Sequence, residues 1–253
     1  MKKNRIIITS VLTTFLLIGT FLLSKTLLRP TTPEITAPVL TQESPKLFNQ
    51  NIGEKLIYEV KLGKITIGKS TFTRLPNATA NGKIILVMTF ETNVTNFKDT
   101  ETIYTDAVTF LPLKIERNIT NWLSKEKITE EYNQSDFTLH INKRKGSNTE
   151  TMVIKKDGPI HNAILLPQQI RYIDSFKPEN AISANLPNRK FEIKMVGEEN
   201  VEVPAGKYKA YKFESTPKQI AIWISADTQK VPLKIQGTGF LGYLMVLKER
   251  IAP

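Results

Sequence analysis

Two segments of alternating residues decide the fold class of this chain: Lys55-Leu-Ile-Tyr-Glu-Val-Lys-Leu62 and Ile65-Thr-Ile-Gly-Lys-Ser-Thr-Phe72. In the first segment every second residue is apolar, so one face of an extended strand carries large apolar side chains and the other carries charges. Gly63-Lys64 separates the two segments and has the composition of a tight turn. The sequence therefore predicts a β-hairpin over residues 55–72.

The same alternation recurs about every ten residues, which is typical of an antiparallel sheet or barrel. Asn81-Gly82 is a strong turn signal, because both residues tolerate positive φ. A helix is expected over Ile164–Ser175, with Pro167 in its first turn. We therefore predict a mainly β fold: an antiparallel sheet curled into a half-open barrel, with one or two short helices. The further predicted strands are Lys83–Thr92, Thr100–Tyr104, Leu113–Asn121, Glu126–Gln134, Phe137–Lys143, Thr151–Lys155, Lys190–Glu198, Lys207–Ser215, Ile220–Ser225, Val231–Thr238 and Leu244–Arg250.

One hairpin pattern occurs twice. Asp106–Ile115 and Asp227–Ile235 each begin with an aspartate and end with Pro-Leu-Lys-Ile. Aspartate favours a turn, and a proline can start the returning strand where no ladder hydrogen bond has to be donated. The flanking sequences do not match, so we interpret the echo as one hairpin design used twice.

The N-terminus carries an export signal. Three cations lie within Met1–Arg5, and the nineteen residues of Ile6–Ser24 contain no charge. As a helix they would be about 28 Å long, close to the ~30 Å thickness of the bilayer core. The cations would stay on the cytoplasmic side, so the remaining chain is expected outside the cytoplasm. The length of the run and the lack of a small-x-small cleavage site favour a retained anchor over a cleaved signal peptide.

The expected organisation has three parts. Residues 1–24 form a signal-anchor or signal peptide, residues 25–50 a Pro-rich linker, and residues 51–253 an extracytoplasmic β-domain. The expected location is the cell membrane, with a single pass through residues 6–24 and the C-terminal domain on the periplasmic side.

Composition limits the partners and the chemistry. The first 47 residues hold six of the 35 cations and two of the 24 anions, which leaves 29 and 22 for the rest. A surplus of about seven positive charges favours anionic partners such as a phospholipid surface, an acidic polymer or an acidic protein. No nucleic-acid recognition motif occurs, so nucleic acid is not an expected partner. The chain has no cysteine, which excludes disulfides and thiol chemistry.

Three motifs in order resemble a known family. They are Gly53–Val60 with Gly68 downstream, Val203-Pro-Ala-Gly-Lys-Tyr208, and Ile222-Trp-Ile-Ser-Ala-Asp227 followed by Val231-Pro-Leu-Lys234. Together they resemble the DUF3108 family, which implies an exported bacterial protein of unknown function and assigns no catalytic residue. The aspartate-turn-proline hairpin also resembles that of LolA/LolB-like lipoprotein carriers, at the level of fold alone.

The histidines and carboxylates of the sequence show no catalytic pattern. His140 is predicted on the solvent face of a strand and His161 on a loop, and no spacing suggests a zinc site. No serine hydrolase elbow, phosphate loop or dinucleotide fingerprint is present. The adjacent Glu130-Glu131 and Glu198-Glu199 would point to opposite strand faces, so we expect solvated edges rather than an acid–base pair. The sequence predicts no enzyme, no metal and no cofactor.

The leading functional hypothesis is a membrane-tethered extracytoplasmic domain that binds an apolar or amphiphilic envelope component on the concave side of the barrel. The alternative is a structural or interaction module of envelope assembly without a small-molecule ligand; an envelope protein would then be the partner instead of a lipid. Lys143-Arg-Lys145 and Lys155-Lys156 lie on either side of one predicted hairpin and could form a basic tip that contacts anionic headgroups or polymer. The alternative interpretation is a solvated hairpin end. The expected ligand-binding residues, chosen by inward parity and size, are Tyr58, Val60, Phe90, Tyr104, Trp223 and Phe240.

Overall fold

The computed structural model describes residues 50–173, 176, 181–237 and 242–253. All described residues belong to one compact unit of the chain, Leu40–Pro253. The expected membrane helix, the linker up to residue 49 and Phe240 lie outside the described residues. Within the described part of the chain, no helix has the length and apolar character needed to span a bilayer.

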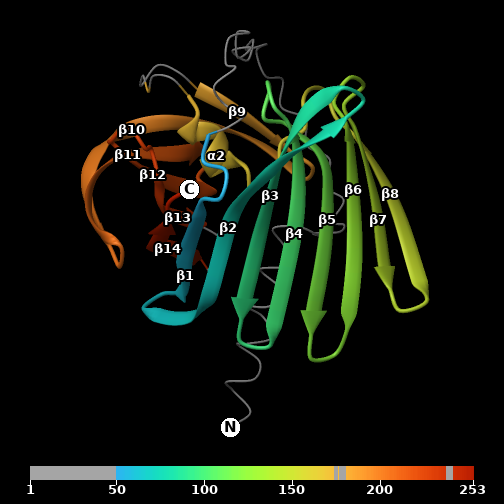
Figure 1. Ribbon diagram of the computed structural model, residues 1–253, viewed down its shortest axis with the longest axis horizontal. Coiled ribbons are helices and arrows are strands. Elements are labelled where there is room, and N and C mark those ends of the chain that lie inside the picture. The colour runs from blue at the N-terminus through green and yellow to red at the C-terminus, as the bar shows by residue number, and fades with distance from the viewer. Residues whose placement is uncertain (1–49, 174–175, 177–180, 238–241) are drawn as a thin grey trace. The chain divides into compact units, whose positions relative to one another are not determined.

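A single antiparallel sheet of 14 strands makes up nearly all of the described structure (Figure 1). Its order is β8-β7-β6-β5-β4-β3-β2-β1-β14-β13-β12-β11-β10-β9. Strands that follow each other in the chain therefore pair, except β8 with β9, and the first strand pairs with the last. β8 and β9 remain at the two edges, so the sheet is not closed. The strands are β1 (Lys55–Leu62), β2 (Ile65–Ala80), β3 (Lys83–Val94), β4 (Phe97–Asp106), β5 (Pro112–Asn121), β6 (Lys125–Asn133), β7 (Thr138–Lys145), β8 (Asn148–Lys155), β9 (Ala181–Leu186), β10 (Arg189–Val203), β11 (Gly206–Thr216), β12 (Ile220–Ser225), β13 (Pro232–Gly237) and β14 (Tyr243–Ile251).

The predicted fold class is confirmed as mainly β and antiparallel. β1 has the predicted bounds, and the turn at Asn81-Gly82 has positive φ angles of 52° and 72°. The predicted helix is shorter than expected: α2 spans Leu166–Arg171, with its proline in the first turn. β9 was not predicted, because Ala181-Ile-Ser-Ala-Asn-Leu186 lacks a clean alternation.

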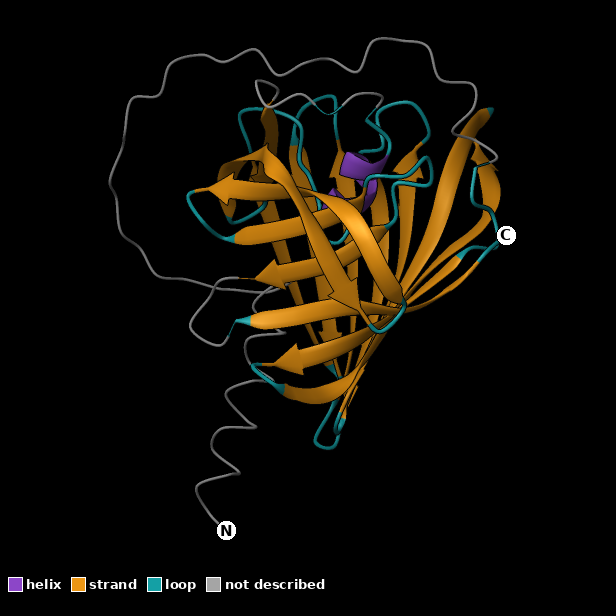
Figure 2. Cartoon of the chain, turned by 90° about the vertical axis from the view of Figure 1, so that its left-hand side faces the viewer, coloured by secondary structure: helices purple, strands orange, loops and turns teal. Residues whose placement is uncertain are grey.

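The sheet curls around α2, so that one of its faces is an inner face (Figure 2). We define the inner face by Leu56, Tyr58 and Val60 of β1, all of them buried. α2 packs against β12 and β13. The hydroxyl of Tyr58 donates a hydrogen bond of 2.9 Å to the carbonyl oxygen of Pro232 and so ties β1 to the start of β13.

The repeated aspartate hairpin is present in the structure. Asp106 Oδ1 accepts hydrogen bonds from the backbone N–H groups of Val108 and Thr109, at 3.0 and 2.8 Å. Asp227 Oδ1 accepts equivalent bonds from Gln229 and Lys230, at 2.9 and 3.1 Å. In each case a proline then begins the next strand, so the same turn chemistry joins β4 to β5 and β12 to β13.

Candidate functional site

The strand register places aromatic and charged side chains in one row across the inner face. Phe72 of β2 lies opposite Phe90 of β3, Phe90 opposite Glu101 of β4, and Glu101 opposite Arg117 of β5. Neighbouring strands are about 4.8 Å apart, so the row passes from apolar to ionic over four strands. Phe90 is half-buried, whereas Phe72 is buried. The inner face is therefore amphiphilic at this point.

A buried ionic cluster surrounds Arg117. We define it as Asp99, Glu101, Arg117 and Glu130, whose exposed fractions are only 5–8%. The guanidinium donates from Nε to both carboxylate oxygens of Asp99, at 3.0 and 2.8 Å, and from Nη2 to Asp99 Oδ2. Arg117 Nε also lies 3.4 Å from Glu101 Oε1, and Tyr132 donates its hydroxyl proton to Glu130. Asp99 and Glu101 thus both contact one guanidinium, whose charge also acts on Glu130.

Burial of this carboxyl excess perturbs two of the acids. Loss of solvation raises the pKa of Glu101 to about 8; Arg117 opposes the shift, and Asp99 and Glu130 add to it. Burial likewise raises the pKa of Glu130, against the hydrogen bond from Tyr132 and the charge of Arg117. At neutral pH the cluster therefore retains a proton on Glu101, because an uncompensated charge in this environment is costly.

We expect the Glu101→Gln variant to lose less stability than the native protein as the pH rises. Between about pH 4.5 and pH 8 folded Glu101 keeps a proton that the unfolded chain has released. The folded state then binds more protons than the unfolded state, so the free energy of unfolding falls across this window. Thermal unfolding of the solubilised full chain at about pH 5 and about pH 9 measures the difference, expected on the order of a few kcal/mol. Glu131→Gln, exposed on the opposite face, is the control; equal pH slopes in native and Glu101→Gln proteins would contradict the assignment.

The predicted ligand-binding residues do not all share a face. The register puts Tyr58, Val60 and Phe90 on the inner face, where Tyr58 and Val60 are 2% and 0% exposed. Tyr104 lies opposite Lys114 and donates to Glu116 at 3.4 Å, on the outer face. Trp223 also faces outward, with Lys212 and Lys234 at 5.5 and 4.2 Å from its ring centroid. The structure thus brings together three of the five described residues.

The prediction of solvated carboxylate pairs is wrong for Glu130. Adjacent glutamates do point to opposite faces, but Glu130 points inward and is buried, whereas Glu131 is exposed. Glu198 and Glu199 are both exposed, and Glu199 accepts the Trp223 indole N–H. The alternation of these side chains could be predicted from the sequence, but the face of β6 that is covered could not.

The two histidines have different surroundings. His140 is exposed on β7, while the Nδ1 of His161 accepts the backbone N–H of Asn185 at 3.2 Å. Burial lowers the pKa of His161. Across the residues that the structure describes, no group of three or more acidic or histidine side chains is placed to hold a metal ion.

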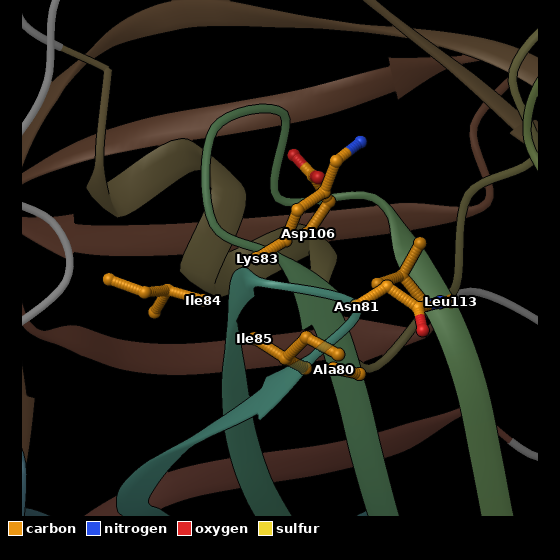
Figure 3. A pocket seen from close by; sticks show the side chains of 7 residues that line it. All are labelled: Ala80, Asn81, Lys83, Ile84, Ile85, Asp106 and Leu113. Atoms are coloured by element: carbon orange, nitrogen blue, oxygen red, sulfur yellow. The ribbon is translucent and has the colours of Figure 1, made fainter.

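A small cavity of about 220 Å³ lies by the β2–β3 and β4–β5 turns (Figure 3). It is lined by Ala80, Asn81, Lys83, Ile84, Ile85, Asp106 and Leu113. The Asp106 carboxylate already accepts the hydrogen bonds of its own turn. The cavity is smaller than the ~300–1,000 Å³ of typical ligand pockets, and no predicted ligand-binding residue lines it. We therefore place the candidate site on the inner face instead.

Comparison with known proteins gives a family and two solved structures. A family model described as "Protein of unknown function (DUF3108)" matches residues 57–248. A β-barrel-like protein of the domain of unknown function DUF1849 from Brucella abortus is 8% identical, with a TM-score of 0.45, over 80% of this chain and 98% of that chain. A protein with a YmcC-like fold from Bacteroides fragilis is 10% identical, with a TM-score of 0.30, over 81% and 98% of the respective chains. No curated protein matches the sequence.

Proposed function

Because the chain belongs to the DUF3108 family of proteins of unknown function, we propose a function from its inner face: the domain binds an amphiphilic component of the cell envelope and does not transform it. The apolar part of the ligand would lie beside Phe90, and its polar part would contact the Asp99–Glu101–Arg117–Glu130 cluster. Residues 6–24 would tether this domain to the membrane on its extracytoplasmic side.

The observation that carries the proposal is the cross-strand row Phe72–Phe90–Glu101–Arg117. A sheet face that served only as a core would be more stable with apolar residues in place of a buried ion cluster. Perturbed acids such as Glu101 are more common at functional sites than elsewhere. Half-buried Phe90 sits at the boundary between the two kinds of surface, where an amphiphile would change from apolar to polar.

Native mass spectrometry of the full chain, extracted from membranes in mild detergent, tests this proposal. The wild-type protein is expected to carry a co-purifying amphiphile, and Phe90→Ala is expected to lose most of it. Tyr104→Ala is the control, because Tyr104 is also a half-buried aromatic residue but lies on the outer face.

Two results would count against amphiphile binding. One is a wild-type protein without bound lipid, in particular one that captures an envelope protein instead; that result would favour an interaction module. The other is an equal loss of ligand in Phe90→Ala and Tyr104→Ala, because the ligand would then not distinguish the two faces of the sheet.

A further inference from the structure

Four hairpin turns lie at the same end of the strands β1–β8. In an antiparallel meander alternate turns share an end, and the β1–β2, β3–β4, β5–β6 and β7–β8 turns lie together along the lower edge of Figure 1. We call this the tip end and define it by residues 63–64, 95–96, 122–124 and 146–147, with the residues that flank them. The turns at the other end include Asp106 and Asp136.

The β5–β6 turn presents two large apolar side chains to solvent. Trp122 and Leu123 are 78% and 77% exposed, and Ile65 in the β1–β2 hairpin is 70% exposed. Asn121 and Ser124 supply the turn chemistry: Asn121 Oδ1 accepts the backbone N–H groups of Leu123 and Ser124, at 2.9 and 2.8 Å. The turn does not need an indole and an isobutyl group at its apex, and such side chains in water are usually kept for contact with a partner.

Cations surround these apolar side chains. The exposed basic residues at the tip end are Lys64, Lys98, Lys125, Lys127, Arg144 and Lys145. The nearby carboxylate of Glu126 is buried and already contacts Lys143 and Lys145, at 3.1 and 2.8 Å. Exposed Glu150 lies on β8, across from Lys143. The tip end therefore keeps a surplus of positive charge next to Trp122 and Leu123.

We propose that the tip end docks onto the surface of an anionic lipid bilayer, with Trp122 and Leu123 in the headgroup region and the surrounding lysines on lipid phosphates. Tryptophan prefers the membrane interface, and lysine can lie along apolar surface while its ammonium group reaches an anion. Each cation near an anionic surface strengthens the attraction by roughly 1 kcal/mol, which is about fivefold in the ratio of docked to undocked domains. This docking is independent of any ligand on the inner face.

Tryptophan fluorescence of the full chain in vesicles tests the docking. The chain has two tryptophans, and Trp223 is 3% exposed, so the difference between wild type and Trp122→Phe isolates the signal of Trp122. In vesicles of phosphatidylglycerol and brominated phosphatidylcholine, Trp122 is expected to shift to the blue and to be quenched by the bromines. Lys125→Gln with Lys127→Gln should lower the docked-to-undocked ratio roughly fivefold per lysine, and Leu123→Ser should also weaken quenching.

The controls lie at the other end of the strands. Val108→Ser and Lys83→Gln remove an exposed apolar and an exposed cationic side chain there, and both should quench like wild type. The proposal is overturned if Trp122 keeps the emission of a water-exposed indole in these vesicles. It is also overturned if the bromines quench Trp122 equally in vesicles of phosphatidylcholine alone. A third contrary result is a blue shift of Trp122 emission with soluble polyglutamate but with no vesicle.

Discussion

Replacing Arg117 by methionine is expected to lower the free energy of unfolding by about 3–5 kcal/mol. Methionine matches much of the volume of arginine but leaves the Asp99 carboxylate, now buried beside Glu101 and Glu130, without the guanidinium that it contacts. Removing one member of a buried ion cluster costs more than the pair contributed, because the remaining charge cannot regain its solvation. Thermal or urea unfolding of the solubilised full chain measures the change.

Lys114→Met is the matched control for Arg117→Met. Lys114 is on the same strand and forms an ion pair of 2.7 Å with Glu116, but both side chains are more than 40% exposed. Such a pair contributes about 0–1 kcal/mol. Adding Asp99→Asn to Arg117→Met should restore part of the stability, because the side chain at position 99 then carries no charge that the lost guanidinium would have to balance. If Arg117→Met and Lys114→Met cost the same, the cluster is not the buried ionic site described above.

The sequence predicts the strands of this protein better than their faces. β1 could be assigned fully, because its charges and apolar groups alternate with Ile57 as the single exception. β4 could not: Tyr104 suggested one inward set, whereas the structure buries Phe97, Asp99, Glu101 and Ile103. The two sets differ by one residue, and a shift of one residue exchanges the faces of a strand. Because the inward-facing residues of β4 include the charged Asp99 and Glu101, this face resembled one that is exposed to solvent.

The candidate site was missed for the same reason. Phe97, Asp99, Glu101 and Ile103 are every second residue of β4. The sequence signal for the buried face was therefore an apolar alternation with two acids in its middle. Only the register, which places Arg117 opposite Glu101, explains how such acids can be buried. The inner face of β12 could not be predicted for another reason. Every residue of Ile220–Ser225 is buried, so no alternation of apolar and polar residues shows which side chains point inward. Long-range pairing of this kind is not encoded within any single strand.

A second ionic cluster joins three distant parts of the chain. Glu54, 1% exposed and directly before β1, accepts hydrogen bonds from Arg171 at 2.5 and 2.9 Å and from Arg250 at 2.7 Å. Arg171 belongs to α2 and Arg250 to β14. Burial alone would raise the pKa of Glu54, but the two arginines hold it below its ordinary value. This carboxylate therefore fixes the helix and the last strand to the first strand.

Glu54→Gln is expected to destabilise the protein by about 3–5 kcal/mol, because it leaves the buried Arg171 without its counter-charge. Since folded Glu54 has a lowered pKa, its contribution is present above about pH 4.5 and is lost as the pH falls through the folded value. The loss in free energy of unfolding caused by Glu54→Gln should thus be largest near neutral pH and smallest in acid. Glu101 has the opposite pH dependence, because its native side chain lowers stability as the pH rises. Glu59→Gln is the control, because Glu59 is partly exposed and contacts Lys61 and Lys248 at 3.3 and 3.7 Å. Unfolding measured from about pH 3 to about pH 9 separates the two acids. Glu54 governs the loss of stability below about pH 4.5, and Glu101 governs the fall between about pH 4.5 and pH 8. An acid limb unchanged in Glu54→Gln would refute this division.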